Sequence, residues 1–189
     1  MTFSEVLEKR YSVRKFSDRP VEKEKLQRIL EAGRLAPTGV NWQPQRLLVL
    51  EGEGMEKFAK CTFFIFGAQL GIMVCYDENV SWTSDWGRST GCIDASMVLA
   101  NMMYAAEEQG LGTIIIGGYN EDRMRELFKI PDYLIPIGVL LTGYPAEDSR
   151  PHPTLHQRKP LEDTVFYGDY SGVVPGEDHR GQHRVKFPD

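Results

Sequence analysis

The chain has 189 residues, of which 41% are hydrophobic, and its acidic and basic side chains leave a formal net charge of −5 at pH 7. This composition excludes a chain that is disordered throughout, and its length fits one domain with an extension. The acidic balance argues against a nucleic-acid-binding surface, and no apolar stretch reaches the roughly 20 residues that a membrane-spanning helix needs. Three cysteines without CxxC spacing predict reduced thiols, and an N-terminus without a signal-peptide pattern predicts a cytoplasmic protein.

Helices and strands follow one another irregularly, each marked by hydrophobic spacing and by capping or turn residues. In chain order the pattern predicts a helix 2–10, a connector 11–16, a helix begun by Pro20 and stopped by Pro37, a loop 37–44, a buried strand 47–50 and a helix 55–60. It continues with a strand 71–76, a polar loop 77–91, a helix 94–109, a strand 113–116, a helix capped by Asn120 and a strand 135–142. Because no regular βαβ rhythm is present, we predict a mixed α/β or α+β layer structure, with helices flanking a mixed sheet.

The predicted helix 94–109 is apolar nearly all round. Asp94 is its expected N-cap and Gly110 its expected C-cap. A helix without a polar face has to be buried, so we expect it at the centre of the domain or at a subunit interface.

The composition changes near Ser171, where glycine, proline and charged residues become frequent. Because such a segment cannot form its own core, the tail 171–189 is predicted to be disordered or draped over another surface, such as that of a partner subunit. We therefore expect a single domain over residues 1–170, followed by this extension.

An alternation of basic and hydroxyl residues marks the connector after the first helix. Arg10, Ser12 and Arg14 can face the same way in an extended chain, and guanidinium groups match phosphate oxygens in bidentate geometry. Arg158 and Lys159 form a second basic pair that could reach the same anion. These residues predict a phosphate-binding site, and a solvated basic surface is the alternative.

Two further features suit a planar ligand. The loop 37–44 offers amide and hydroxyl groups that can bind the edge of a heteroaromatic ring, although an ordinary hydrogen-bonded loop is the alternative. Its polar side chains are Thr38, Asn41 and Gln43. Gly117 and Gly118 follow a predicted strand and would let a flat ligand approach backbone N–H groups, but a turn that needs a positive φ explains the pair equally well.

Other classes of site leave little trace in the sequence. The Gly-Leu-Gly run 110–112 follows a helix and precedes a strand, the reverse of the order in a dinucleotide fingerprint, and neither a GxSxG elbow nor a P-loop is present. Two histidine pairs, His152 with His156 and His179 with His183, have four-residue spacing. Because prolines and glycines surround them, we interpret them as solvated loop residues and predict no metal site.

Six short motifs occur in a fixed order between about residues 3 and 167. They are RYSVRKF at 10–16, APTGVNWQP at 36–44, AAEEQGLGT at 105–113, IP at 130–131, GYP at 143–145 and RKPLE at 158–162. As an ordered set they resemble the nitroreductase family of FMN-dependent oxidoreductases. The resemblance implies an α+β fold and a homodimer joined through the long central helix, with FMN at the interface.

The resemblance also implies roles for individual residues. Those that would hold the flavin phosphate and ring edge are Arg10, Ser12 and Arg14, with Tyr11 adding backbone or packing contacts and Arg158 and Lys159 a second phosphate contact. Those that would pack against the flavin from the other subunit are Pro37, Thr38, Asn41 and Gln43. Gly117 and Gly118 would present backbone N–H groups near the flavin N5.

The activity that the resemblance implies is hydride transfer from NADH or NADPH to FMN and then to a small acceptor, nitroaromatic or quinone-like, in alternating half-reactions. Arg14 or Arg10 would stabilise the reduced ring. This chemistry needs no side-chain acid or base, so no catalytic residue is predicted, and Trp42 and Tyr119 are candidates for lining the substrate pocket. A flavin store or sensor without turnover, and a specialised reaction such as reductive dehalogenation or flavin fragmentation, are the alternatives.

The sequence departs from the family pattern at four places. Gln45 follows Pro44 where an aromatic residue is frequent, and Gly117 stands where an acidic residue is common. The stretch 61–64 has neither the amide nor the lysine that larger members direct at the flavin. The region between the second strand and the central helix is short, so we expect a different substrate lid.

Overall fold

The computed structural model describes residues 2–155 and 157–176, and its contacts divide them into a first unit, 2–151, and a second unit, 152–176. The helices of the first unit are α1 (Phe3–Lys9), α2 (Lys23–Arg34), α3 (Glu53–Ala59), α4 (Gly91–Glu108) and α5 (Glu121–Phe128), with a 3-10 turn η1 (Gly39–Asn41). Its strands are β1 (Gln45–Glu51), β2 (Leu70–Asp77), β3 (Gly112–Ile116) and β4 (Leu134–Gly143). The second unit contains the 3-10 turn η2 (Leu161–Asp163).

Some sequence predictions fall on positions that are not described. His156, and both His179 and His183, lie outside the described residues, as does the part 177–189 of the predicted tail. Among the helices that the structure does describe, none combines the length and the apolar character needed to cross a bilayer.

The four strands form one sheet in the order β1-β2-β4-β3, and each neighbouring pair is antiparallel. The α+β class is confirmed, but the prediction of a mixed sheet is wrong for these strands. Strand direction depends on the path of the connections, which hydrophobic spacing does not encode. An isolated parallel bridge joins Ser12 to Thr113 and lays the connector 11–16 along β3.

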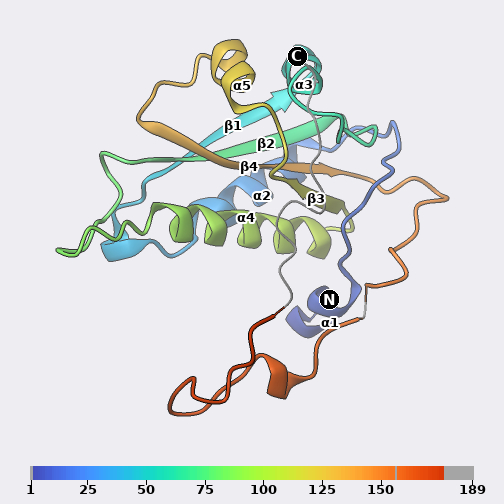
Figure 1. Cartoon of the computed structure of the whole chain (residues 1–189). Helices are drawn as coiled ribbons and strands as arrows, with labels where there is room; N and C mark the ends of the chain where they lie inside the picture. The colour runs from blue at the N-terminus through green and yellow to red at the C-terminus, as the bar shows by residue number, and fades with distance from the viewer. Residues whose placement is uncertain (1, 156, 177–189) are drawn as a thin grey trace. The chain divides into compact units, whose positions relative to one another are not determined.

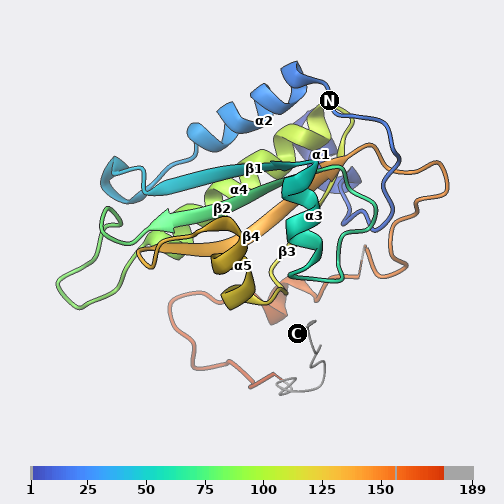
Figure 2. The ribbon, with the colours of Figure 1, turned by 90° about the horizontal axis from the view of Figure 1, so that it is seen from above.

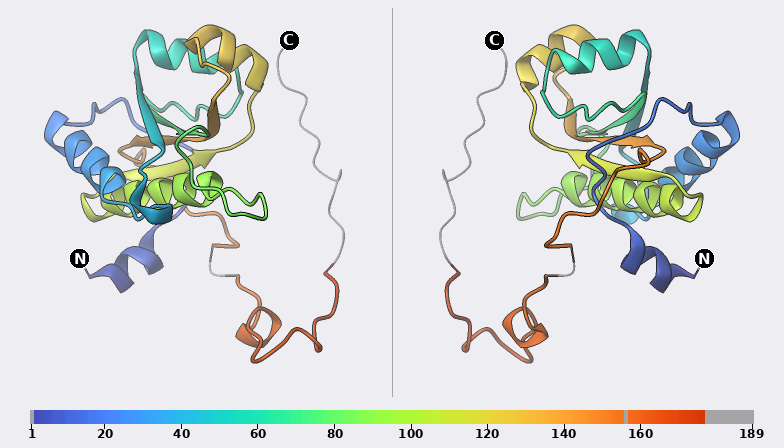
Figure 3. Two further views of the ribbon diagram at one scale, coloured as in Figure 1. Left: turned by 90° about the vertical axis from the view of Figure 1, so that its left-hand side faces the viewer. Right: turned by 90° about the vertical axis from the view of Figure 1, so that its right-hand side faces the viewer.

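Helices cover both faces of the sheet. Figures 1 and 3 show α2 and α4 on one face and α3 and α5 on the other, and Figure 2 shows α3 and α5 in front of the strands when the sheet is viewed from above. The two cores follow the alternation of side chains in β2: Ile72 and Val74 pack with α4, whereas Met73 and Cys75 pack with α3 and α5. Because both faces are covered, β2 is apolar from Leu70 to Cys75.

Local caps form where the sequence predicts them. The hydroxyl of Thr2 accepts the Glu5 N–H at 3.3 Å while the Glu5 carboxylate accepts the Thr2 N–H at 2.7 Å, which completes the predicted capping box. The Asn120 side chain accepts the Arg123 N–H at 3.0 Å and caps α5. At the other end of α4 the cap is one residue earlier than predicted: Gln109 is the C-cap, and Gly110 follows it with φ +74°.

Three predicted boundaries or burial states are wrong. Helix α4 begins at Gly91 with Thr90 at its N-cap, so Asp94 lies within the first turn, where its carboxylate accepts the Gly39 N–H instead of capping the helix. Helix α2 begins at Lys23, three residues after Pro20, and Glu22 stands at its N-cap. Strand β1 lies at an edge of the sheet, so its Leu48 side chain is 42% exposed instead of buried.

The two sides of α4 differ. One side packs against the sheet and α2 through Ala95, Val98, Leu99, Met102 and Ala106. On the other side Ile93 and Met97 are exposed, and Tyr104 meets the exposed Phe3 of α1 edge to face, with ring centroids 5.4 Å apart. Helix α4 is therefore buried on one side only, and an apolar strip on its other side is exposed to solvent.

Candidate functional site

The connector 11–16 is fixed by two buried residues, Val13 on β3 and Phe16 on the turn that contains Phe66. The N–H of Val13 donates to the Thr113 carbonyl at 2.9 Å, and the Val13 side chain is buried. Phe16 is also buried, and its N–H donates to the Phe66 carbonyl at 3.0 Å. Because alternate residues of an extended chain face opposite sides, Ser12 and Arg14 face away from this core.

Arg14 lies beside a pocket of about 230 Å³ at the open edge of β3. The pocket is lined by Arg14, Phe64, Phe66, Ile114, Ile115, Ile116, Gly117 and Gly118. Among these described lining residues Arg14 carries the charge, and its guanidinium also donates to the Ser12 carbonyl at 3.3 Å. The structure therefore brings together three sequence-predicted residues, Arg14, Gly117 and Gly118.

The two glycines follow β3 directly. Gly117 does not have a positive φ, so the turn alternative is wrong for this residue, and a Cβ added to it would meet nothing within 4 Å. Its backbone thus faces open space that a ligand can fill. The Gly118 carbonyl, by contrast, points inward and accepts the hydroxyl of Thr62 at 2.7 Å.

Arg10 and Tyr11 do not line this pocket. Arg10 ends α1 and is half-buried near the carboxyl end of α4, where burial raises the pKa of Glu107 and the charges of Arg10 and Lys9 oppose that increase. Tyr11 is half-buried, and its hydroxyl donates to the Ser149 hydroxyl at 3.3 Å. Tyr11 thus ties the start of the connector to the segment that follows β4.

The loop 37–44 has a strained backbone. Val40, Asn41 and Gln43 have φ values of 46°, 59° and 53°, a left-handed region that is unfavourable for a β-branched residue such as Val40. The hydroxyl of Thr38 accepts the Gln43 N–H at 3.1 Å, and the Gln43 amide donates to the Asn41 carbonyl at 3.3 Å. Strain of this kind persists only where the surroundings hold it, and it is concentrated at ligand-binding loops.

Asp94 provides that support from the first turn of α4. Its buried carboxylate accepts the Gly39 N–H at 2.9 Å and the Thr90 hydroxyl at 3.1 Å. The residue was predicted only as a helix cap, because its partner Gly39 lies 55 positions away in the sequence. Figure 1 shows η1 beside the start of α4.

The segment between β2 and α4 is fastened to the same helix end. Thr90 donates its N–H to the Trp82 carbonyl at 2.9 Å, and the Ser81 and Ser89 hydroxyls lie 2.9 Å apart. At the tip of this segment Trp86 is 94% exposed. Sequence reasoning did not select Trp86. Trp42, a candidate for pocket lining, is exposed as well, so two large aromatic rings are accessible at this end of the molecule.

Tyr119, the other candidate for pocket lining, belongs to the core. Its ring packs edge to face against Phe58, and its hydroxyl donates to the Pro136 carbonyl at 3.3 Å. Burial raises the pKa of Tyr119 to about 12. Tyr119 is therefore not among the residues that line the pocket beside Arg14, and its place in a substrate pocket stays a prediction.

The two candidate ligand-binding regions lie on opposite edges of the sheet. The pocket adjoins β3, whereas the loop 37–44 leads into β1, and β2 and β4 lie between these strands. Three strand spacings correspond to roughly 14 Å. One copy of the chain therefore presents Arg14 and the loop 37–44 as separate surfaces.

Arg158 and Lys159 belong to the second unit. The Arg158 guanidinium donates to the Leu155 carbonyl at 2.6 Å and to the Gln157 carbonyl at 2.8 Å. Its convergence with Arg10 on one anion stays a prediction. Lys159 lines a pocket of about 370 Å³ within the second unit, together with Phe166.

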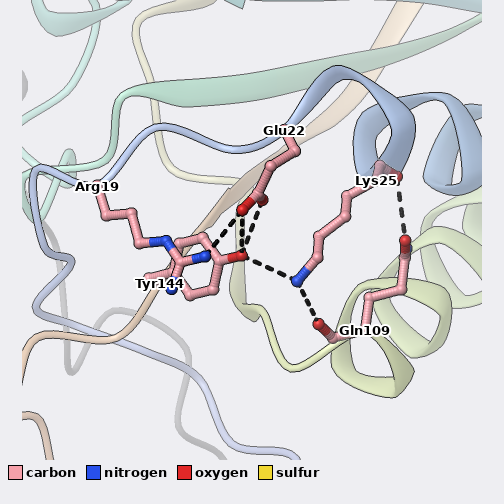
Figure 4. A network of polar contacts seen from close by, with 5 residues as sticks. All are labelled: Arg19, Glu22, Lys25, Gln109 and Tyr144. Atoms are coloured by element: carbon pink, nitrogen blue, oxygen red, sulfur yellow. Dashed lines mark hydrogen bonds and ion pairs between the residues drawn. The ribbon is translucent and has the colours of Figure 1, made fainter.

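Tyr144, the tyrosine of the GYP motif, contacts the segment 19–25, which follows the connector and leads into α2 (Figure 4). Tyr144 donates its hydroxyl to the Glu22 carboxylate at 2.8 Å and accepts Lys25 Nζ at 2.8 Å, while the Arg19 guanidinium lies 3.7 Å from its ring centroid. The Tyr144 hydroxyl, followed by a backbone N–H and Arg19, lowers the pKa of Glu22 to about 2. Lys25 also donates to the Gln109 carbonyl at 2.8 Å, so the network joins α2 to the end of α4.

The chain is similar in sequence to known proteins. The sequence profile described as "Nitroreductase family" matches residues 7–64 and 60–144. A Methanothermobacter thermautotrophicus protein named NADH dehydrogenase/NAD(P)H nitroreductase is 32% identical over an alignment of 161 residues that covers 78% of this chain and 80% of that protein.

Solved structures are similar over most of the chain. A nitroreductase family protein from Clostridium difficile 630 is 42% identical with a TM-score of 0.84, covering 89% of this chain and 99% of that one. An FMN-dependent nitroreductase from Clostridium difficile R20291 is 26% identical with a TM-score of 0.70, covering 87% of this chain and 98% of that one. Together with the profile match, these similarities show that the chain belongs to the nitroreductase family of oxidoreductases.

Proposed function

We propose that the chain is an FMN-dependent oxidoreductase that takes a hydride from NADH or NADPH and passes it to a small electron-accepting organic molecule, nitroaromatic or quinone-like, in alternating half-reactions. The active form is a homodimer with each FMN between the two copies. Family membership and the name of the FMN-dependent relative support the cofactor. The observation that carries the proposal is the pocket that joins Arg14 to Gly117 and Gly118.

The residues around this pocket fit the ring system of a flavin. Gly117 leaves its backbone open to a planar ligand, and Phe64 and Phe66 supply apolar surface beside it. Arg14 supplies positive charge, which stabilises the negative charge that a flavin gains on reduction. FMN, once bound, supplies hydride acceptance and donation, while the chain binds the cofactor, orients it and tunes its electronics. No side chain is assigned a catalytic role.

The phosphate of the cofactor would be held by the basic residues outside the pocket. Arg10 and Ser12 precede Arg14 on the connector, whose start is fixed by Tyr11. Arg158 and Lys159 would complete the phosphate site from the second unit. Guanidinium groups suit this role because they bind phosphate oxygens in pairs.

Three observations support a site shared by two copies. The loop with Pro37, Thr38, Asn41 and Gln43 lies at the opposite edge of the sheet from Arg14, so a second copy is needed to bring both to one ligand. The open side of α4 and α1 exposes Phe3, Leu7, Ile93 and Met97, an apolar strip of the kind that subunit contacts cover. The second unit also exposes large apolar side chains that could pack on a partner: Leu161, Tyr167, Tyr170 and Val174.

Anaerobic titration of the purified protein tests the proposal. We expect a yellow protein with flavin absorbance that NADH or NADPH bleaches and that an added quinone restores. Colour that persists under both nucleotides but is bleached by dithionite would favour the flavin store or sensor. A colourless preparation that takes up no added FMN would refute the proposal.

A pair of neighbouring variants tests the role of Arg14. Arg14→Ala should raise the FMN dissociation constant by about tenfold to a hundredfold, the range expected for a lost hydrogen bond to a charged group. Lys15→Ala is the control, because Lys15 is exposed and pairs with Asp148 instead of lining the pocket. Equal FMN affinities for the two variants would remove Arg14 from the site.

A further inference from the structure

Thr62 lies behind the pocket, in the turn that connects α3 to β2. Its side chain is 1% exposed, and its hydroxyl donates to the Gly118 carbonyl at 2.7 Å. The same oxygen accepts the Phe64 N–H at 3.3 Å. Gly118 and Phe64 both line the pocket, so one buried hydroxyl is bonded to two of its walls.

A second contact ties the same two segments together. The Cys61 carbonyl accepts the N–H of Asn120 at 2.8 Å, and Asn120 in turn caps α5. The strand-end segment 117–120 is thus held against the turn 61–64 at two neighbouring points. Of the two, the Thr62 contact is the one made directly to a pocket-lining residue.

The turn itself has one favoured arrangement. The rings of Phe64 and Phe66 are stacked, with centroids 6.1 Å apart and an interplanar angle of 23°. Phe66 has a φ of 54°, an unfavourable value for an aromatic residue, and its carbonyl is fixed by the N–H of Phe16. A backbone held in this strained form depends on its neighbours, so loss of the Thr62 hydroxyl would release the Phe64 side of the turn.

The sequence offers no amide or lysine in the stretch 61–64, and the structure gives Thr62 a different kind of contact. Its hydroxyl is directed at the backbone of the pocket walls rather than into the pocket. An O–H···O contact of 2.7 Å has the preferred length, and Thr62 itself is buried.

We propose that Thr62 is a positioning residue that fixes the Gly117–Gly118 backbone against the Phe64–Phe66 turn and thereby sets the gap into which the flavin ring edge fits. The inference rests on the proposed function, since the ligand of the pocket is the flavin. Thr62 does not touch the ligand. It acts through Gly118 and Phe64, whose orientation determines which donors and which aromatic surface face the ring.

Valine and serine variants of the FMN-loaded protein separate the hydroxyl from the shape of the side chain. Thr62→Val keeps the branched shape and removes both hydrogen bonds, whereas Thr62→Ser keeps the hydroxyl. We expect Thr62→Val to raise the FMN dissociation constant about threefold to tenfold. It should also shift the midpoint potential of the bound flavin and accelerate hydrogen exchange of the Phe64 amide. Thr62→Ser should stay within about twofold of the parent.

Thr142→Val is the matched control. Thr142 is equally buried, and its hydroxyl makes no hydrogen bond within the described part of the chain. Its replacement removes a buried hydroxyl without removing a contact, so FMN affinity, flavin potential and Phe64 exchange should match the parent. This variant shows whether a core Thr→Val change alone alters the flavin.

The outcomes distinguish the two hypotheses. A Thr62→Val protein that is less stable but has the affinity and potential of the parent overturns the positioning role and leaves the proposed function intact. A parent protein that binds no FMN overturns the proposed function and this inference with it. If Thr62→Val does not fold, Thr62→Ala takes its place, and equal flavin properties in the alanine and serine variants would then refute the role of the hydroxyl.

Discussion

Replacement of Gly112 by alanine should destabilise the protein where the connector packs on β3. A Cβ at Gly112 would lie 2.4 Å from Val13 Cγ2 and 2.9 Å from Pro145 Cγ, whereas carbon atoms in contact are ordinarily about 3.5–4.0 Å apart. Neither neighbour yields easily, because valine is stiff at χ1 and proline is a closed ring. Val13 is also buried and bonded through its N–H to Thr113.

The expected cost follows from these contacts. Overpacking of a buried site costs about 1–3 kcal/mol of stability. Because both Val13 and Pro145 would have to move, we place Gly112→Ala at the upper end of that range. A lower conformational entropy of the unfolded chain offsets about 0.4–1 kcal/mol of this. We therefore expect the free energy of unfolding to fall by about 2 kcal/mol, roughly a thirtyfold change in the folded-to-unfolded ratio. Because Val13 anchors the connector, displacement of Arg14 should weaken FMN binding too.

Gly117→Ala is the matched control, because a Cβ there meets nothing within 4 Å and the residue has no positive φ. Its unfolding free energy, measured by urea denaturation of the flavin-free protein, should stay within about 0.5 kcal/mol of the parent. Its FMN affinity should nevertheless fall, since the new methyl group occupies the space assigned to the ring. Equal urea stabilities for Gly112→Ala and Gly117→Ala would refute the steric argument.

Three further changes have defined outcomes. Asp94→Ala should lower the unfolding free energy by about 1.5–3 kcal/mol in urea denaturation, because the Gly39 N–H and the Thr90 hydroxyl, both half-buried, lose their carboxylate acceptor. A smaller loss of stability than in an exposed Asp→Ala control would contradict this reasoning. The pKa of Glu22 is lowered to about 2 in the folded protein, so its stabilising contribution is present above pH 4.5 and declines as the pH falls toward 2. Glu22→Gln should remove that part of the dependence of stability on pH. If the curves of unfolding free energy against pH are the same for the parent and the variant, the Glu22 network does not stabilise the fold. In a Cys92→Ser background no thiol should react with Ellman's reagent at pH 8 until urea is added, because burial raises the pKa of Cys61 and raises that of Cys75 to about 11.

Features that depend on neighbouring residues could be predicted from the sequence, whereas features that depend on distant partners could not. The capping box of Thr2 and Glu5 and the Asn120 cap involve residues three positions apart, and both form as predicted. Asp94 was assigned to the helix end because its true partner, Gly39, lies far away in the chain. The hydroxyl of Thr62 could not be placed either, because it bonds to a carbonyl 56 positions later.

The same reasoning explains which part of the candidate site the sequence could supply. Arg14 and Gly117 were selected because their residue types suit an anionic, planar ligand, and the structure places them around one pocket. The pairing of that pocket with the loop 37–44 requires a second copy of the chain, and residue types carry no information about such a pairing. That part of the site therefore remains a proposal.

A site assembled from two copies couples ligand binding to association. If FMN binds only where Arg14 of one copy meets the loop 37–44 of another, then FMN stabilises the dimer and dilution weakens FMN binding by mass action. Flavin fluorescence measured during serial dilution at a fixed FMN-to-protein ratio should therefore report release at the concentration where sedimentation shows dissociation of the dimer. Asp94→Ala, which frees the loop from α4, should move flavin release to higher protein concentration even where the dimer persists. Flavin that stays bound to a monomer would show that one copy suffices, and the separation of roughly 14 Å across the sheet would then have to be closed within a single chain.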